Sequence, residues 1–278
     1  MEPSTDPRTD PPASCRRPEL GGSRARNAVV VAVANQKGGV GKTTTAINLG
    51  AALGAFEKRV LIVDCDPQGN ATRGLGAEAE PPHLYHVLAG QKGAREAVQQ
   101  TGFAGLSLLP ANHELVGVEV EFVGTDAWEL RLRRAIADLL PDYDYVFLDC
   151  PPSLGHLTVS ALSAADQVLV PLQSEYFALE GISALVATVR RVQARVNPRL
   201  AIGGVVITMY DDRTLLSRDV AEEARRHFGD VVFKAVVPRN VRLAEAPSHG
   251  RPILHYDVKS RGALAYLAVA RELMGRLS

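Results

Sequence analysis

The sequence predicts an α/β fold in which helices cover both faces of a doubly wound, mostly parallel sheet. Apolar runs of strand length alternate along the chain with longer segments that carry apolar residues at helical spacing. Several of the apolar runs end in carboxylates, which in parallel sheets face the ligand crevice. Strands that alternate with helices of this length form parallel sheets through right-handed crossovers, so helices are expected on both faces.

The expected elements follow in order from residue 29. We expect strands at 29–34, 59–64, 106–109, 143–150, 167–172, 200–209 and 231–237. We expect helices at 43–54, 126–140, 178–196, 215–228 and 261–277, with a shorter helical patch at 85–89.

Composition indicates a globular chain with a tail. The 278 residues are 46% hydrophobic and 22% charged, and no stretch approaches the length of a membrane span. Residues 1–27 hold five of the 17 prolines and no apolar run, so we expect a disordered tail followed by one domain over 28–278. Three cysteines and no signal-peptide pattern favour a reducing cytoplasm.

A glycine-rich loop joins the first expected strand to the first expected helix. It consists of Lys37, Gly38, Gly39, Val40, Gly41, Lys42, Thr43 and Thr44. The glycines let backbone N–H groups turn toward an anion, and the start of the helix adds a partial positive charge. Lys42 can then reach β- and γ-phosphates, and Thr43 offers the hydroxyl that Mg²⁺ prefers. The loop therefore predicts a nucleotide site.

One position departs from the general phosphate-binding loop. Gln36 stands where that pattern has its first glycine, and a second lysine, Lys37, follows it. In this the loop resembles the deviant Walker A box, KGGxGK[ST], of the ParA/MinD family of ATPases. The resemblance implies ATP as the nucleotide and a face-to-face homodimer in the ATP state, in which Lys37 crosses to the partner's nucleotide.

Two further strands end in acidic motifs. The run from Asp64 to Asn70, DCDPQGN, resembles the family's second motif, which implies that Asp66 orients the attacking water and that Asp64 lies near the magnesium shell. A turn-capping role stays open for both carboxylates. Asp149 ends the strand at 143–150 and has the shape of a Walker B element, so we expect it to hold a magnesium-bound water.

Cysteines and histidines do not add a metal site to this prediction. Cys65 and Cys150 lie within the two acidic motifs and are expected to be small buried residues. His83 and His86 are three residues apart, but no matching partners follow them in the sequence, so we expect no metal site there.

Residues 237–250 resemble a signature of chromosomal ParA (Soj) proteins. The resemblance implies that Pro238 and Asn240 lie against the adenine and that Arg242 touches DNA. Arg213, in the turn at 211–214, matches a second DNA-contacting arginine.

The charge distribution agrees with a DNA surface in the C-terminal third. The net charge is −7 over residues 1–189 and +7 over residues 190–278, although the whole chain is neutral. The sequence has no recognition-helix or zinc-finger pattern, so we expect contacts with phosphates rather than base edges. Chance, or a surface pairing of the two oppositely charged halves, stays open as the alternative.

The resemblance as a whole implies a cytoplasmic, nucleoid-associated ATPase of chromosome partitioning. Its ATP-bound homodimer binds DNA non-specifically, and a ParB-like centromere-binding partner stimulates the hydrolysis that releases it. A membrane-associated ATPase similar to MinD is an alternative, but helix 261–277 has too mixed a charge for stable membrane association. A redox protein similar to nitrogenase iron protein would need cysteines that bridge two subunits. A ParA-like ATPase that positions a plasmid or another cargo stays open.

Overall fold

Seven strands form one sheet in the part of the chain that the structure, a computed structural model, describes: residues 28–122, 124–175 and 178–277. The strands are β1 (Val29–Val33), β2 (Val60–Asp64), β3 (Gln99–Gln100), β4 (Leu106–Leu109), β5 (Tyr145–Asp149), β6 (Gln167–Gln173) and β7 (Ala201–Thr208). Their order is β3-β4-β2-β5-β1-β6-β7, and every pair is parallel except β3 with β4. The predicted fold class is confirmed, whereas the predicted disordered tail, residues 1–27, lies outside the described residues.

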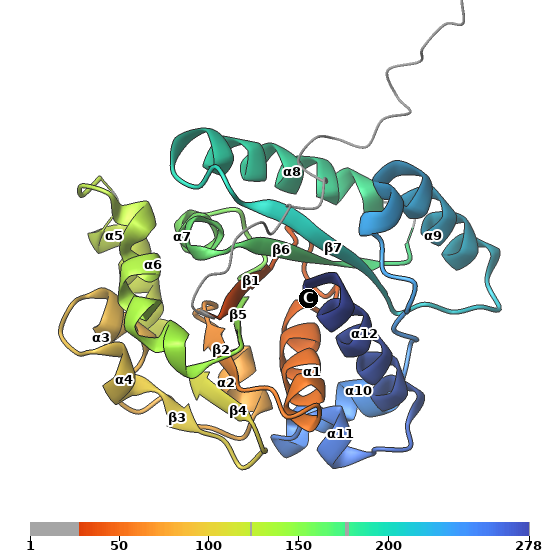
Figure 1. Cartoon of the computed structure of the whole chain (residues 1–278), viewed down its shortest axis with the longest axis horizontal. Helices are drawn as coiled ribbons and strands as arrows, with labels where there is room; N and C mark the ends of the chain where they lie inside the picture. The colour runs from red at the N-terminus through yellow and green to blue at the C-terminus, as the bar shows by residue number, and fades with distance from the viewer. Residues whose placement is uncertain (1–27, 123, 176–177, 278) are drawn as a thin grey trace, which may run out of the picture.

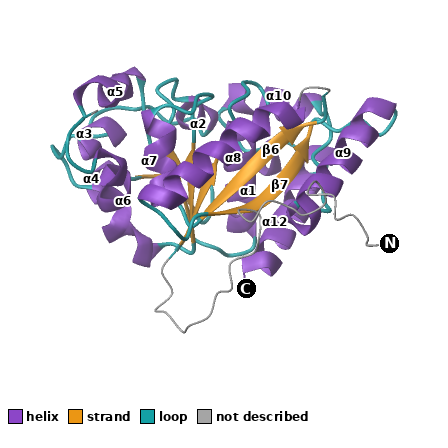
Figure 2. Cartoon of the chain, turned by 90° about the horizontal axis from the view of Figure 1, so that it is seen from above, coloured by secondary structure: helices purple, strands orange, loops and turns teal. Residues whose placement is uncertain are grey.

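Helices cover the sheet on both faces (Figures 1 and 2). The α-helices are α1 (Lys42–Ala55), α2 (Asn70–Gly74), α3 (Leu84–Leu88), α4 (Ala94–Ala97), α5 (Gly117–Glu121), α6 (Arg131–Ile136), α7 (His156–Ala164), α8 (Ala178–Arg195), α9 (Leu215–Phe228), α10 (Val241–Glu245), α11 (Ile253–Tyr256) and α12 (Arg261–Leu277). Short 3₁₀ turns add η2 (His113–Val116), η3 (Trp128–Leu130), η4 (Ala137–Asp142), η5 (Gly229–Val231) and η6 (Ala246–His249). Figure 1 shows α6, α7 and α8 on one side of the sheet and α1 and α12 on the other.

The two faces of β1 explain why its sequence lacks polar alternation. Val30 and Ala32 pack into the core beneath α7 and α8, while Val31 and Val33 pack into the core beneath α1 and α12. Because both faces of a covered parallel strand are buried, each position favours an apolar residue. No helix among the described residues is long and apolar enough to cross a membrane.

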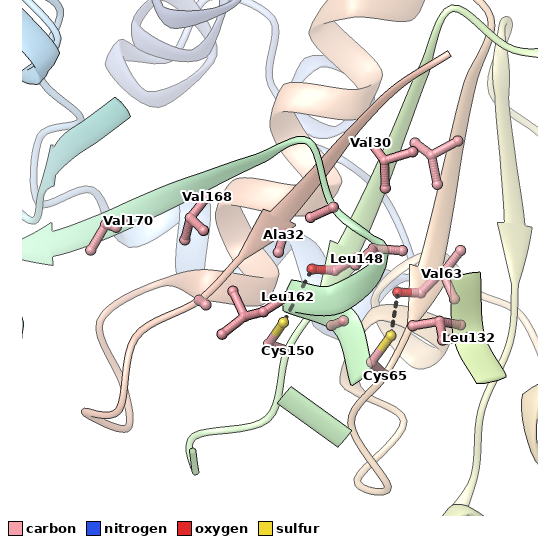
Figure 3. Close-up of a cluster of buried hydrophobic side chains, with 14 of the residues drawn as sticks. Val30, Ala32, Val63, Cys65, Leu132, Leu148, Cys150, Leu162, Val168 and Val170 are labelled. Atoms are coloured by element: carbon pink, nitrogen blue, oxygen red, sulfur yellow. Dashed lines mark hydrogen bonds between the residues drawn. The ribbon is translucent and has the colours of Figure 1, made fainter. Parts of the chain in front are cut away.

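Both cysteines of the described chain are buried and unpaired, as the sequence predicts. Figure 3 shows each thiol donating to a backbone carbonyl of its own strand, Cys65 to Val63 at 3.7 Å and Cys150 to Leu148 at 3.6 Å. They therefore fill the core as small side chains.

The strand predicted at 231–237 is wrong. Its ends do bond to β7, since the N–H groups of Phe233 and Val237 donate to carbonyls of that strand. In the middle, however, the N–H groups of Lys234 and Ala235 donate to the carboxylate of Glu272 on α12, at 3.0 and 3.1 Å. A side chain therefore takes the hydrogen bonds that a continuous ladder would need, and only isolated bridges remain.

The segment predicted as one surface helix at 126–140 is helical from residue 128 onward, but as three consecutive pieces, η3, α6 and η4, rather than as a single α-helix. Ala127 has a φ of 51°, a left-handed conformation that cannot be part of a right-handed helix. Pro141 lies within the final 3₁₀ turn, where it has no N–H to donate. The other predicted strands and long helices agree with the structure to within about two residues, and α9 spans the predicted 215–228.

Candidate active site

The central strands bring three chain segments to one edge of the sheet. β5 lies between β1 and β2, and Asp149 at its end is in register with Val33 of β1 and with Asp64 of β2. The chain leaves β1 into the glycine-rich loop and then enters α1. The loop, Asp64 and Asp149 therefore meet at the carboxyl end of the sheet.

The glycine-rich loop leaves open space above its backbone. Gly39 and Gly41 have φ of 75° and 89°, which only glycine adopts without strain. A Cβ added at Gly38 or Gly39 would meet no atom within 4 Å. The loop is anchored from below, since the hydroxyl of Thr208 at the end of β7 donates to the carbonyl of Val40 at 2.8 Å. Such a fixed, open cradle of backbone at a helix start suits a phosphate.

Lys42 begins α1 and is only 7% exposed. Its ammonium donates to the carbonyl oxygen of Lys37 at 3.1 Å. Burial lowers the pKa of Lys42, and the nearby carboxylate of Asp149 opposes that shift. A desolvated ammonium has most to gain from an anionic partner, so its setting fits the predicted phosphate contact.

Lys37 has a partner that sequence reasoning missed. Its ammonium lies 3.0 Å from a carboxylate oxygen of Glu175, just after β6, and the guanidinium of Arg239 lies 4.0 Å from the same side chain. The backbone N–H of Lys37 donates to Asn35, whose amide donates to the carbonyl of Pro171 on β6 at 2.8 Å. No local sequence pattern predicts the contact of Lys37 with Glu175, because the two residues are 138 positions apart in the chain.

Asp149 is the carboxylate that best fits a magnesium ion. It is fully buried, and neither oxygen has a well-aligned hydrogen-bond partner among the described residues, although the hydroxyl of Thr43 lies close enough to lower its pKa. Burial raises the pKa of Asp149 well above its usual range, and Asp64 adds to this, while Thr43 and Lys42 oppose it. An unpaired buried carboxylate is costly, and a divalent cation would provide the missing partner. Thr43 and Asp149 are therefore the residues that would hold Mg²⁺.

The carboxylate of Asp64, unlike that of Asp149, already accepts several hydrogen bonds. One of its oxygens accepts from the N–H and the hydroxyl of Thr72, at 2.8 and 2.7 Å, and the other accepts from the N–H of Asp66 at 3.2 Å. The hydroxyl of Thr72 in turn accepts from the N–H of Ala111. Asp64 thus organises the loop after β2, and its place in the magnesium shell stays a prediction.

Asp66 lies in the same loop and is 6% exposed. One carboxylate oxygen accepts from the N–H of Gln68 at 2.9 Å, which closes a tight turn. The second oxygen is not used in that turn. Its predicted role in orienting water stays a prediction.

The predicted adenine contacts lie at the neighbouring end of β7. Pro238 forms an isolated parallel bridge with Tyr210, and the N–H of Arg239 donates to the carbonyl of Tyr210 at 3.0 Å. The side chain of Asn240 accepts from the N–H of Arg242 and so caps α10. Since β7 also anchors the glycine-rich loop, the turn at 238–240 belongs to the same end of the sheet, while its contact with adenine stays a prediction.

Comparisons with known proteins identify the family. A family model described as an AAA domain matches residues 28–202. The chain is 53% identical over 251 residues to the chromosome partitioning protein ParA of Caulobacter vibrioides, covering 89% of this chain and 94% of that protein. It is also 53% identical over 249 residues to the chromosome-partitioning ATPase Soj of Thermus thermophilus, with 89% and 96% covered.

Solved structures agree in fold. A cobyrinic acid a,c-diamide synthase from Mycobacterium smegmatis with bound ADP and magnesium is 40% identical, has a TM-score of 0.80, and is matched over 90% of this chain and 95% of that one. The septum site-determining protein MinD of Pyrococcus horikoshii, complexed with Mg-ADP, is 28% identical, with a TM-score of 0.74 and 88% and 96% covered. The chain therefore belongs to the ParA/MinD family and, within it, to the ParA/Soj chromosome-partitioning ATPases, which makes it an ATPase that uses ATP and Mg²⁺.

Proposed function

We propose that this chain is a nucleotide-driven DNA switch, cytoplasmic and nucleoid-associated, that segregates chromosomes. In the proposed cycle an ATP-bound homodimer holds DNA without sequence preference, and hydrolysis stimulated by a ParB-like partner releases it. Two features found together carry this proposal. One is the loop at 37–44 with its additional Lys37, and the other is the buried carboxylate of Asp149, without a well-aligned partner, at the end of the adjacent strand. The ParA and Soj relatives support the same assignment.

The proposed reaction is in-line attack of water on the γ-phosphate. The water oxygen bonds to the γ-phosphorus as the bond to the β,γ-bridging oxygen breaks, leaving ADP and phosphate. Asp66 orients the water, and Lys42 exchanges the carbonyl of Lys37 for phosphate oxygens. When bound, Mg²⁺ supplies positive charge beside the phosphates. Such catalysis rests on positioning and electrostatics, so turnover should be slow without the partner protein.

Lys37 is the proposed link between the two subunits. In the structure its ammonium pairs with Glu175 of its own chain, and the two side chains are 36% and 44% exposed. An ion pair this exposed contributes about 0–1 kcal/mol, so it can open readily when a triphosphate is presented from across the interface. The proposed role of Lys37 in the dimer is to neutralise charge that develops on the partner's nucleotide.

Lys37→Ala is expected to bind ATP as a monomer and to fail to dimerise, because it removes the cation that would cross the interface. Light scattering with a non-hydrolysable ATP analogue measures this directly. Glu175→Gln is the matched control, since it frees Lys37 and should leave the ATP-dependent dimer intact or strengthen it. A normal ATP-dependent dimer in Lys37→Ala would contradict the assignment.

The proposed DNA surface contains two exposed arginines. The side chain of Arg213, just before α9, is 85% exposed, and that of Arg242 in α10 is 55% exposed. Each forms an ion pair with a nearby carboxylate, Arg213 with Asp211 at 2.7 Å and Arg242 with Glu245 at 2.9 Å. The pair of Arg213 with Asp211 is bidentate, and Arg242 also lies 3.7 Å from Asp257, so DNA phosphates would have to compete with these carboxylates.

Arg213→Glu and Arg242→Glu are each expected to lose DNA binding while keeping ATP-dependent dimerisation. The corresponding alanine variants should lower the slope of log affinity against log salt by about one for each DNA phosphate that a subunit no longer neutralises. A filter-binding salt titration gives these slopes. Arg133→Glu is the control, because this exposed arginine of α6 lies on the opposite side of the molecule from α9 and undergoes the same charge change (Figure 1). Unchanged slopes, or strong preference for one DNA sequence, would overturn the proposed surface.

The MinD-like alternative would need a terminal helix with an apolar face available to a membrane, which α12 does not offer. The apolar face of α12 is already used, since Ala263, Tyr266, Val269, Ala270 and Leu273 are buried. The hydroxyl of Tyr266 also shares a hydrogen bond with Thr45 of α1 at 3.1 Å. This helix would have to leave α1 before it could insert that face into a membrane surface.

The synthase name of the Mycobacterium smegmatis structure suggests another activity, but the site does not favour it. An amide synthase that worked through a covalent cysteine intermediate would need an activated thiolate. Burial raises the pKa of both cysteine thiols in the described chain, Cys65 and Cys150, so neither is activated. Relatives named for partitioning are also more similar in sequence, at 53% against 40%.

A further inference from the structure

His83, His86 and Glu114 form a compact group away from the glycine-rich loop. One ligand atom from each lies within 4.8 Å of the other two. His83 directly precedes α3, His86 is within α3, and Glu114 belongs to η2, which follows β4. The sequence-based expectation of no metal site rested on the lack of a nearby partner, and the fold provides that partner from another segment.

The group is short of hydrogen bonds. His83 is 0% exposed, and neither of its ring nitrogens has a hydrogen-bond partner among the described residues. Its Nε2 lies 3.3 Å from a carboxylate oxygen of Glu114, a contact near hydrogen-bond distance but poorly aligned. The Nδ1 atom of His86 is buried and unpaired as well. Buried polar atoms without partners cost about 1–3 kcal/mol each, so such a group calls for a missing ligand.

The two segments that carry the group are held in place by their own backbones. The N–H of Leu84 donates to the carbonyl of Pro110 at 2.9 Å, which ties the start of α3 to the end of β4. The side chain of Asn112 accepts from the N–H of Glu114 at 2.9 Å and so begins η2. The rings of His83 and His86 meet edge to face, with 4.4 Å between their centroids. The three side chains are therefore brought together by a framework that does not depend on a bound ion.

We propose that His83, His86 and Glu114 bind a zinc ion, with solvent in the remaining coordination position. Two imidazole nitrogens and one carboxylate oxygen are a donor set that suits zinc. Ligand atoms around tetrahedral zinc lie about 3.3 Å apart, so the side chains must close in slightly from their present spacing. His86 is half-buried and the side chain of Glu114 is 55% exposed, so both side chains are free to make that adjustment.

The zinc ion would brace a loop that supports the nucleotide site. Three residues before Glu114, the N–H of Ala111 donates to the hydroxyl of Thr72, which donates to Asp64. Joining η2 to α3 through a metal would hold that chain of hydrogen bonds in place. Stabilisation of these two joined segments is the effect expected of the ion, although its three protein ligands differ from the four of closed structural zinc sites.

The test uses the full chain without a polyhistidine tag, in a Cys15→Ser background that removes the thiol of the tail. The protein is treated with a chelator and kept with excess ADP and Mg²⁺, so that the nucleotide site is filled. Co²⁺ is the spectroscopic probe, and Zn²⁺ affinity is measured by competition. We expect one equivalent of Co²⁺ with the intense visible bands of four-coordinate cobalt, displacement by Zn²⁺, and a higher melting temperature with Zn²⁺ than without.

Two variants and one control decide the assignment. His86→Gln and Glu114→Gln should each lower Zn²⁺ affinity at least about tenfold, since even changes behind a metal ligand cost that much. Both sites are partly exposed, so these variants should fold, which circular dichroism checks. His227→Gln, on the exposed face of α9, should bind Zn²⁺ as the parent does. Failure of the parent to bind, or equal affinity in the parent and both cluster variants, would overturn the proposal without touching the ATPase assignment.

Discussion

Lys42→Ala should lose nearly all measurable ATP binding, and hydrolysis with it. The ammonium of Lys42 is buried in the loop and donates to a neutral carbonyl in the structure, so phosphate oxygens would be its first anionic acceptors. Two charge-assisted hydrogen bonds to phosphates are worth about 1.5–3 kcal/mol each, or about 3–6 kcal/mol together. That loss corresponds to about 10²–10⁴-fold in affinity. Isothermal titration calorimetry with Mg-ATP measures the change.

Folding has to be separated from binding in this variant. Burial lowers the pKa of Lys42, so its charge is held at a cost in the folded state, and its removal should not unfold the protein. Lys92→Ala is a matched control, because Lys92 is an exposed lysine outside the loop that is paired with Glu96. Tight ATP binding by a folded Lys42→Ala protein would refute the assignment of the loop.

Asp149→Asn should abolish the extra stability that Mg-ATP gives, without weakening the nucleotide-free protein. The pKa of Asp149 is higher in the folded state than in the unfolded state. As the pH rises from the unfolded-state pKa to the folded-state pKa, the free energy of unfolding therefore falls. A neutral amide removes that penalty, and the melting temperature should hold or rise, by about 2–4 °C per kcal/mol. ATP at about 100 times its Kd should add about 2.7 kcal/mol to the parent, and the variant should lose most of this gain. Thermal melting with and without Mg-ATP measures both the stability of the nucleotide-free variant and its stabilisation by Mg-ATP. The ATP turnover of the variant should fall as well.

Asp64→Asn is the contrasting variant, because Asp64 accepts three hydrogen bonds that Asp149 lacks. An amide has only one acceptor oxygen, and its NH₂ group would face the N–H of Asp66 or of Thr72. The nucleotide-free protein should therefore lose about 1–3 kcal/mol and melt several degrees lower. If instead Asp149→Asn kept the full Mg-ATP stabilisation and Asp64→Asn lost it, the metal assignment would belong to Asp64.

Local chemistry was readable from the sequence alone. The strand, glycine loop and helix at 29–55 follow from apolar patterning and from glycines at positions of positive φ, both of which act over a few neighbouring residues. The helix at 215–228 was predictable for the same reason, since Thr214 caps it and its apolar residues recur at helical spacing. The family motifs occupy these local segments, so the residue pattern was enough to predict the nucleotide site.

The failed strand prediction occurred where a distant side chain changed the local outcome. Residues 231–237 have the composition of a strand, but Glu272 of α12 takes the N–H groups in the middle of the segment. The segment at 126–140 is helical only from residue 128, because Ala127 before it is left-handed, and its two ends are 3₁₀ turns rather than α-helix. Propensity describes a chain segment in isolation, whereas packing decides which hydrogen bonds it makes.

The sequence by itself therefore determined the glycine-rich loop, the carboxylates at the strand ends and the alternation of strands with helices. Only the tertiary structure decided which strand ends meet, and with that the different surroundings of Asp64 and Asp149. It also decided that Lys37 pairs with Glu175, and that Glu114 joins His83 and His86. The physical reason is that patterning and turn chemistry act between neighbours in the chain, while strand order and side-chain contacts join residues whose separation carries no local signal.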